Sequence, residues 1–481
     1  MAEDLGRGGE VRQTVPARPA GTPEPGEIIA VGTRASGDGR IEPIEAPLPG
    51  EPMLRWLSHA QTIDEIEKEL GRIWAQPNLV VDSDGERQGR YIAVRTSVMN
   101  LVVLAQQPEV GERAAEAIGR LTGRHPSRTM IVLSADPDGP AWLDARIEAH
   151  CVLPRADAPE TCSELIYLTA GGETGRHLTA LVAPLLIHDL PVTTWWPGEP
   201  SLGSEPTDDV LDLTDRLVVD GSGWSGDGLA RLRQLARLYD LHERIAIRDF
   251  ALARQSRWRE AIATVFDLPE FLPYLAHVRR IAVTYGTHDE TGAPGTTNVV
   301  KPLYHAAWLA TRLGMRVVAP LAPVEAKRRG GAAGGPLRPG EKAPLHRGLA
   351  ASLRSGSADV SVVIRPVASA MPPGTTLRLE LRAERRGSEL RADVTAEAEN
   401  VHVHAWLDGV EALDRTFKAP RRSEVDLLGE ALEAGSRDPL ATETIRMAAR
   451  LAGPATPGYA RASAAAAATA AGALATGAHP D

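Results

Sequence analysis

The sequence contains very little cysteine. Its 481 residues include only two, Cys151 and Cys162, and two thiols cannot supply the disulfide framework that holds small secreted domains together. Their spacing also fits neither a C-x-x-C redox pair nor a zinc site. We therefore expect two buried, reduced thiols. A regulatory pair is the alternative, and it requires that the strands carrying the two cysteines lie side by side.

Long apolar runs are missing too. No uncharged apolar stretch approaches the roughly 18 residues that a membrane-spanning helix needs. The N-terminal stretch MAEDLGRGGEVRQTVPARPAGTPEPGE lacks the continuous apolar segment of a secretory signal. These absences predict a cytoplasmic protein that does not associate with a membrane.

A basic surface is also absent. The formal net charge is −10 and the isoelectric point is about 5.8, which argues against non-specific binding to nucleic acid. Aromatic residues make up only 4% of the chain, although hydrophobic residues reach 43%, an ordinary share for a globular protein. The length suffices for two or three domains with a sizeable core.

The familiar catalytic motifs are not found. The sequence has no G-x-x-x-x-G-K-[ST] phosphate loop, no G-x-S-x-G nucleophile turn and no H-E-x-x-H metal motif. The glycine-rich stretch TAGGETGRH, residues 169–177, is better explained as a turn than as a dinucleotide loop, because its glycines lack the required spacing. A bound anion near Arg176 or His177 is the alternative. The sequence therefore predicts no catalytic residue, no cofactor and no metal site.

Segments rich in proline, glycine and alanine divide the chain. We predict a disordered tail at residues 1–55, an α/β domain at 60–225, a helical connector at 226–275, an α+β C-terminal domain at 276–452 with a flexible basic insert at 325–348, and an alanine-rich disordered tail at 453–481.

The patterns of the first domain predict the class α/β, with a mixed, partly parallel sheet flanked by helices. RYIAVRTSVMNLVVLAQ and SRTMIVLSAD are typical of strands, and PEVGERAAEAIGRLTG between them is typical of a helix, so the three form a βαβ unit. In the smaller C-terminal domain, four alternating segments predict an antiparallel meander. They are DVSVVIRPV, TTLRLELRAE, ELRADVTAEAE and VHVHAWL.

Only a few titratable side chains lie close together in the sequence. Arg124, His125 and Arg128 in GRHPSR are candidates for binding a phosphate or an acidic partner, although cations at the C-terminus of a helix also complement its dipole. His402 and His404 share one face of a strand, where solvent-facing histidines are a simpler interpretation than a metal site.

Two adjacent tryptophans, Trp195 and Trp196, stand in front of the turn Pro197-Gly198-Glu199. Alternation along a strand sends their side chains to opposite faces. We expect one indole ring to fill the core and the other to lie near the surface, where tryptophan is a favoured interface anchor. All five residues are therefore predicted to lie at or near a partner contact.

Four segments resemble, in the same order, motifs of the OpcA family of glucose-6-phosphate dehydrogenase assembly proteins. They are GRHPSRTMIVLSAD, LVAPLLIHDLPVTTWWPGEP, RDFALARQSRWREAIATVFD and SEVDLLGEALEAGSRDPLATETIRMA. The resemblance extends over about residues 60 to 452. The two tails and the insert at 325–348 are not typical of the family.

The resemblance implies a non-enzymatic protein of the oxidative pentose phosphate pathway, which supplies NADPH. Its partner would be glucose-6-phosphate dehydrogenase, whose oligomer it helps to assemble and which it activates allosterically. Such a role needs a docking surface and no catalytic groups. A sugar-phosphate or nucleotide-binding α/β enzyme and a metabolite sensor are the alternatives, with Arg124, His125, Arg128, Arg176 and His177 as anion-binding candidates.

Overall fold

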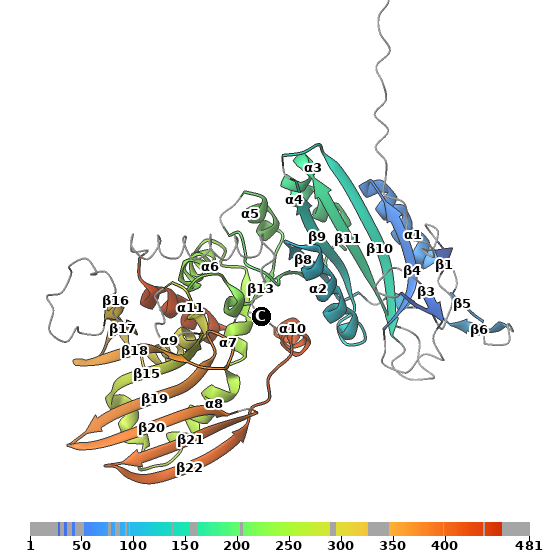
Figure 1. Cartoon of the computed structure of the whole chain (residues 1–481). Coiled ribbons are helices and arrows are strands. Elements are labelled where there is room, and N and C mark those ends of the chain that lie inside the picture. Colours follow the sequence, from blue (N-terminus) through green and yellow to red (C-terminus); the bar gives the residue numbers. More distant parts are fainter. Residues whose placement is uncertain are drawn as a thin grey trace, which may run out of the picture.

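Two β-sheets are joined by a layer of helices (Figure 1). The computed structural model describes residues 52–75, 78–81, 87–91, 94–95, 97–136, 138–152, 161–202, 205–288, 295–325, 346–397, 399–435 and 438–454, together with strand segments at 27–28, 33–35 and 41–43. The predicted disordered tails and the predicted flexible insert lie mostly outside the described residues. The exceptions are these three strand segments and residues 52–55, 325, 346–348 and 453–454.

The first sheet has ten strands in the order β1-β4-β10-β11-β9-β8-β12-β13-β14, and β7 pairs with β11. Its strands are β1 (Glu27–Ile28), β4 (Pro52–Ala60), β7 (Val94–Arg95), β8 (Met99–Ala105), β9 (Ser127–Ala135), β10 (Trp142–Val152), β11 (Thr161–Gly171), β12 (Val192–Trp196), β13 (Arg216–Val219) and β14 (Ala246–Asp249). The pairs from β11 through β9, β8, β12 and β13 to β14 are parallel, whereas β10 is antiparallel to both of its neighbours. The predicted mixed, partly parallel sheet is confirmed.

Helices cover both faces of this sheet, as its parallel strands require. The helices of this half are α1 (Ile63–Ala75), α2 (Pro108–Leu121), α3 (Gly172–Arg176), α4 (Leu178–Val182), α5 (Glu205–Asp212) and α6 (Leu229–Leu241), with short 3₁₀ turns at η1 (Ala183–Leu185) and η2 (Gly221–Gly223). The predicted βαβ unit is β8-α2-β9. Every residue of β8 is buried, which is why its sequence is apolar apart from Asn100.

The second sheet has eight strands in the order β16-β17-β18-β15-β19-β20-β21-β22. They are β15 (Val278–Thr287), β16 (Arg316–Glu325), β17 (His346–Ser355), β18 (Ala358–Ala368), β19 (Thr376–Arg385), β20 (Ser388–Glu397), β21 (Asn400–Leu407) and β22 (Val410–Lys418). Three of the four predicted strands, β19 to β21, form an antiparallel meander, and β22, which was not predicted, extends it. The first predicted strand, β18, is separated from the second by β15, which is parallel to β18 and antiparallel to β19.

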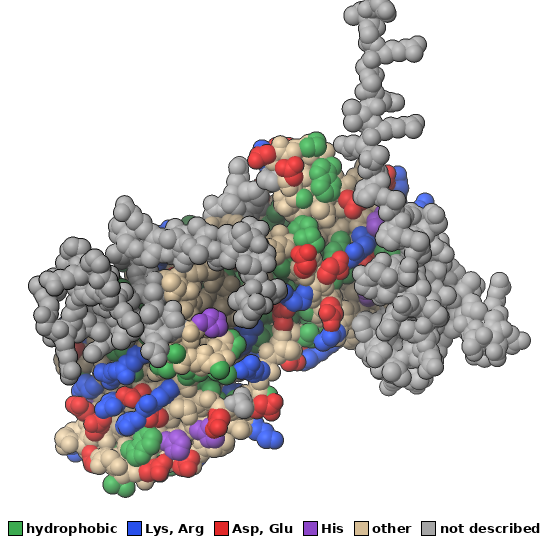
Figure 2. Space-filling view, in the orientation of Figure 1, with side chains coloured by type: hydrophobic (Ala, Val, Ile, Leu, Met, Phe, Trp, Pro, Cys, Tyr) green, Lys and Arg blue, Asp and Glu red, His purple; other side chains and the backbone are tan. Residues whose placement is uncertain are grey.

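The remaining helices are α7 (Phe250–Ala253), α8 (Ser256–Val265), α9 (Val300–Arg312), α10 (Glu424–Glu433) and α11 (Pro439–Ala452), with η3 (Leu272–His277). One face of the second sheet packs against α8, α9 and η3. Its other face carries ion pairs. Glu380 and Asp393, for example, both accept hydrogen bonds from the guanidinium of Arg378. Basic and acidic side chains are interspersed over this lobe of the molecule (Figure 2).

The two halves share one hydrophobic core. The larger cluster of buried side chains runs from Val102 in the first sheet, through Leu235 in α6 and Leu303 in α9, to Ile281 in the second sheet. A smaller cluster lies on the opposite face of the first sheet, where α10 returns from the C-terminal segment to pack beside α2. The chain therefore folds as two sheets held together by a buried, apolar junction.

Two sequence predictions differ from the structure in detail. The segment predicted as one long strand from RYIAV to VVLAQ contains the end of β6 (Arg87–Tyr91) and two further strands, β7 and β8. The predicted helical connector at 226–275 includes β14, which pairs with β13 at the edge of the first sheet. Only four residues form β14, too few for alternation to identify it between two helical patterns. Two short hairpins, β2 (Thr33–Ala35) with β3 (Ile41–Pro43) and β5 (Asn78–Val81) with β6 (Arg87–Tyr91), complete the described strands.

Candidate functional site

The tryptophan pair lies in β12, in the middle of the first sheet. The side chains of Trp195 and Trp196 do point to opposite faces, because they belong to the two different core clusters. Trp195 is 0% exposed and Trp196 is 4% exposed, so the prediction that one ring lies near the surface is wrong. The reason is that β12 is an interior strand with both faces covered. On one face the ring of Phe250 in α7 lies 6.4 Å from that of Trp195.

The turn that follows β12 is fixed by internal contacts. Pro197, Gly198 and Glu199 are partly exposed, but Glu199 accepts from the Nε of Arg231 at 2.8 Å and from the backbone N–H of Ser225 at 3.0 Å. Burial opposes ionisation of Glu199, and the hydrogen bonds from Ser225 and Arg231 outweigh it and lower the pKa of its carboxyl. The turn is therefore a rigid part of the surface.

The predicted anion-binding residues Arg124, His125 and Arg128 do not form one site. Arg124 pairs with Glu433 at the end of α10, and the Nε2 of His125 lies 3.7 Å from the same carboxylate. Burial, opposed by Glu433, lowers the pKa of His125. Arg128 lies on β9 and pairs with the fully buried carboxylate of Glu164. The acidic partners of this segment are thus α10 and β11 of the same chain.

The other basic candidates are also paired. Arg176 donates to Asp138 at 2.8 Å, and His177 lies 2.9 Å from Glu173. On the outer face of the second sheet, His404 forms a group with two carboxylates, in which one ligand atom from each residue lies within 4.8 Å of the others. The carboxylates come from Glu411 and Asp414, both exposed, and such exposed ion pairs form readily without a metal.

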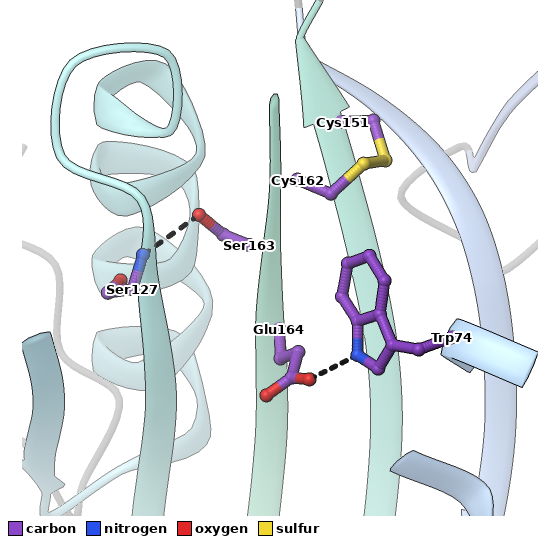
Figure 3. The surroundings of a disulfide bond; sticks show 6 residues. All are labelled: Trp74, Ser127, Cys151, Cys162, Ser163 and Glu164. Carbon is purple, nitrogen blue, oxygen red and sulfur yellow. Dashed lines mark hydrogen bonds between the residues drawn. A yellow bond between two sulfur atoms is a disulfide. The ribbon is translucent and has the colours of Figure 1, made fainter. Parts of the chain in front are cut away.

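The two cysteines are joined in a disulfide. Cys151 in β10 and Cys162 in β11 lie directly opposite each other in the antiparallel pair, with their Cα atoms 4.0 Å apart. Both are buried, but the prediction of two reduced thiols is wrong, because the strands that carry them are neighbours. Figure 3 shows the bond close to the indole of Trp74, which donates to Glu164.

Replacement of Cys151 by serine tests what this bond contributes. A cross-link that closes a loop of this length removes unfolded-state entropy equivalent to about 3 kcal/mol. We expect Cys151→Ser to lower the free energy of unfolding by about this amount in oxidising buffer, measured by urea denaturation. In excess reductant the difference in free energy of unfolding between the wild type and the variant should largely disappear. If the difference is the same in oxidising and reducing buffer, packing of the side chain, and not the disulfide bond, is responsible for it.

A buried carboxyl group links the two halves at the end of β14. Asp249 is 4% exposed and accepts hydrogen bonds from the backbone N–H groups of Gly221 and Ala251, at 2.9 and 2.8 Å, and from the hydroxyl of Tyr304 in α9 at 2.7 Å. A Cβ atom on Gly221 would lie 2.7 Å from the carboxylate, so only glycine fits there. Asp220, the last residue before η2, pairs nearby with Arg254.

The pKa of Asp249 makes this junction sensitive to pH. Burial is the largest cause that raises this pKa, to about 6 from the ordinary 3.8, and the hydrogen bond from Tyr304 opposes the rise. Because the folded chain holds the proton more tightly than the unfolded chain, the stability from this group is fully present below about pH 4 and is lost as the pH rises through 6. The loss amounts to about 3 kcal/mol.

Comparison with Asp249→Asn isolates this effect. The amide cannot ionise, so the difference in free energy of unfolding between wild type and variant should shift by about 3 kcal/mol between about pH 3 and about pH 7, against the wild type. Denaturant unfolding at a series of pH values measures it. Parallel curves for the two proteins would mean that Asp249 has an ordinary pKa in the folded chain.

Sequence reasoning missed Asp220, Asp249 and Tyr304. A signal for the two aspartates was present, since each stands at the carboxyl end of a short strand, in RLVVD and AIRD. The carboxyl ends of adjacent parallel strands meet at one edge of a sheet, where polar residues gather. Tyr304 gave no such signal, because it lies in a continuously buried stretch of α9.

Family models match most of the chain. Two models describe the N-terminal and the C-terminal domain of a "Glucose-6-phosphate dehydrogenase subunit"; the first matches residues 118–237 and the second matches residues 245–445. A search of curated protein sequences found no match. None of the helices in the described residues has the length and apolar composition that crossing a membrane requires.

Solved structures resemble the chain only distantly. A candidate oxidoreductase of Magnetospirillum magnetotacticum MS-1 is 14% identical, with a TM-score of 0.39, over 74% of this chain and 99% of that one. An oxidoreductase domain protein of Kribbella flavida is 12% identical, with a TM-score of 0.32, over 78% and 96% of the two chains. Likenesses this low carry no inference about activity or ligands.

Proposed function

The chain belongs to the OpcA family of proteins that assemble with glucose-6-phosphate dehydrogenase, and we propose that it is a non-enzymatic partner that binds this dehydrogenase, promotes its assembly and activates it allosterically. The observation that carries the proposal is the succession of the two family domains over residues 118–237 and 245–445. The proposal places the complex in the cytoplasm and in the oxidative pentose phosphate pathway, at the step that supplies NADPH.

Activation by a bound partner needs no catalytic group. A protein that binds the active oligomer more tightly than the inactive form shifts the population toward the active one. A tenfold shift needs a difference in binding free energy of about 1.4 kcal/mol. The continuous core between the two sheets favours such a role, because a rigid partner loses little conformational entropy when it binds.

The turn at residues 197–199 remains our candidate for the dehydrogenase contact. Because both indole rings are buried in the core, they cannot reach a partner, and contact would be made by Pro197, Gly198 and Glu199. The backbone of the turn is held by the amide of Gln106, which donates to the carbonyl of Glu199 at 2.7 Å. A fixed, partly exposed turn suits a docking surface, since little order is lost on binding.

Gly198→Arg tests this contact without disturbing the fold. A Cβ atom at Gly198 would meet only the side chain of Gln106, at 3.6 Å, so the larger side chain projects into solvent. We expect the variant to bind the dehydrogenase at least tenfold more weakly, measured by biolayer interferometry, with an unchanged melting temperature. The matched control is Gly71→Arg in α1, where nothing lies within 4 Å. Equal binding by both variants would remove the turn from the interface.

The assembly itself is tested with purified wild-type proteins. Light scattering of the dehydrogenase of the same organism, with and without this chain, should show a complex that contains both. Sedimentation of the two proteins as separate species at micromolar concentration would refute the proposal.

A further inference from the structure

A large cavity lies between α8, α9 and the segments that lead into β19 and α10. Its volume is about 710 Å³, well within the range of small-molecule sites. Five cationic side chains line it, against two carboxylates, Glu260 and Glu430. The cations are Arg254, Arg257, Lys301, Arg421 and Arg422.

Three of these cations are neutralised within the protein. Arg254 pairs with Asp220 at 2.8 Å, Arg257 pairs with Glu260 at 2.7 Å, and Arg422 pairs with Glu430. The other two cations, Lys301 and Arg421, have no such partner among the described residues. Among the described residues, no carboxylate lies within ion-pair distance of Lys301 or Arg421, and the guanidinium of Arg421 has only a weak contact, at 3.6 Å, with the sulfur of Met371.

The surroundings of Lys301 favour an anion. Burial lowers the pKa of this lysine, the charge of Arg254 lowers it further, and Asp220 only partly opposes them. An anion placed between the lysine and Arg421 would relieve this crowding of positive charge. A phosphate group is well matched, because lysine and arginine both donate charge-assisted hydrogen bonds to its oxygens.

Some of the residues that line the cavity carry buried polar atoms without partners within the described ranges. His305 is 1% exposed, and its Nδ1 has no hydrogen-bond partner among the described residues. Gln255 is 3% exposed and donates its amide N–H to the carbonyl of Lys301, which leaves its Oε1 without a donor in the described part of the chain. Burial, together with the charges of Arg259 and Lys301, lowers the pKa of His305 to about 3, so the ring is neutral. Unpartnered acceptors of this kind suit hydroxyl donors.

The start of α8 adds a further attraction for an anion. The helix begins at Ser256, and Gln255 at the N-cap makes no side-chain capping hydrogen bond. Residues 254–258 line the cavity, so the first turn of α8 lies at its wall. Helix N-termini of this kind favour bound anions.

We propose that this cavity binds a small phosphate monoester that carries hydroxyl groups. Lys301, Arg421 and the first turn of α8 hold the phosphate, and His305 and Gln255 accept hydrogen bonds from the hydroxyls. The inference rests on the cavity alone, and it holds whether or not the chain assembles with the dehydrogenase.

Isothermal titration calorimetry with ribose 5-phosphate tests this site in the full-length chain. We expect saturable binding, with ribose and inorganic phosphate each binding at least tenfold more weakly, because each supplies only half of the contacts. Lys301→Gln and Arg421→Gln should each weaken binding of ribose 5-phosphate at least tenfold. Arg316→Gln should leave it unchanged, since Arg316 is exposed on the edge strand β16 and does not line the cavity.

Arg421 is exposed, so its replacement tests the site even where Lys301→Gln prevents folding. The proposal is overturned by absence of binding at millimolar ribose 5-phosphate. It is equally overturned by binding that survives Arg421→Gln undiminished, or by binding that falls as much in Arg316→Gln as in Arg421→Gln.

Discussion

Trp195→Ala and Trp196→Ala should each lower the free energy of unfolding by about 3–5 kcal/mol, because removal of a buried indole leaves a cavity in a core that cannot fully collapse. The two rings fill different cores, one on each face of β12, so their effects should be nearly additive in the double variant. Urea denaturation followed by circular dichroism measures these losses. Binding to the dehydrogenase should fall only in proportion to the unfolded fraction.

Trp142→Ala is the matched control, because its ring is 39% exposed at the start of β10. Its loss should amount to about 1 kcal/mol or less. A variant of Trp195 or Trp196 that keeps full stability and loses dehydrogenase binding would show that the ring contacts the partner directly. That result would contradict the burial of both rings.

Glu164→Gln should lower the free energy of unfolding by about 3–5 kcal/mol, since it leaves the charge of Arg128 buried without a counter-ion. The carboxylate is 0% exposed and Arg128 is 8% exposed, and the guanidinium also donates to the backbone carbonyl of Leu185 at 2.9 Å. Replacement of both charged residues by apolar ones, Arg128→Met with Glu164→Leu, should recover much of the loss. Thermal and urea unfolding measure both effects.

Glu116→Gln provides the comparison on the surface. Glu116 pairs with Arg120 at 2.6 Å on the exposed side of α2, and an exposed pair of this kind contributes about 0.5 kcal/mol or less. If Glu164→Gln and Glu116→Gln lower the free energy of unfolding equally, the charge of Arg128 is accessible to water. Burial would then not explain the contribution of the pair to stability.

The sequence predicted those parts of the fold in which pattern and burial coincide. The apolar run at residues 101–105 of β8 and the helical spacing in α2 identified the βαβ unit, because both faces of a buried parallel strand are largely apolar. It was harder to predict which strands pair with each other. The alternation in β15, β18 and β19 gives the face that each strand buries but not its partner, so the insertion of β15 between the other two could not be read from it.

The candidate site was also predicted only in part. Alternation correctly placed Trp195 and Trp196 on opposite faces, but exposure depended on Phe250 and α10, which arrive from distant parts of the chain. Arg124 and Arg128 are close in sequence, yet their carboxylate partners are Glu433 and Glu164. Basic residues that look like an anion site in the sequence were thus neutralised by contacts that only tertiary structure creates.

The most direct test of the proposed function is the initial rate of the dehydrogenase at subsaturating glucose 6-phosphate, measured as this chain is added. We expect the rate to rise and saturate at a fixed molar ratio of the two proteins, with a lower KM or a higher kcat in the complex, and Gly198→Arg should shift the titration to higher concentration. An unchanged rate, KM and oligomer size at a large excess of the folded chain would contradict the role of assembly factor and activator.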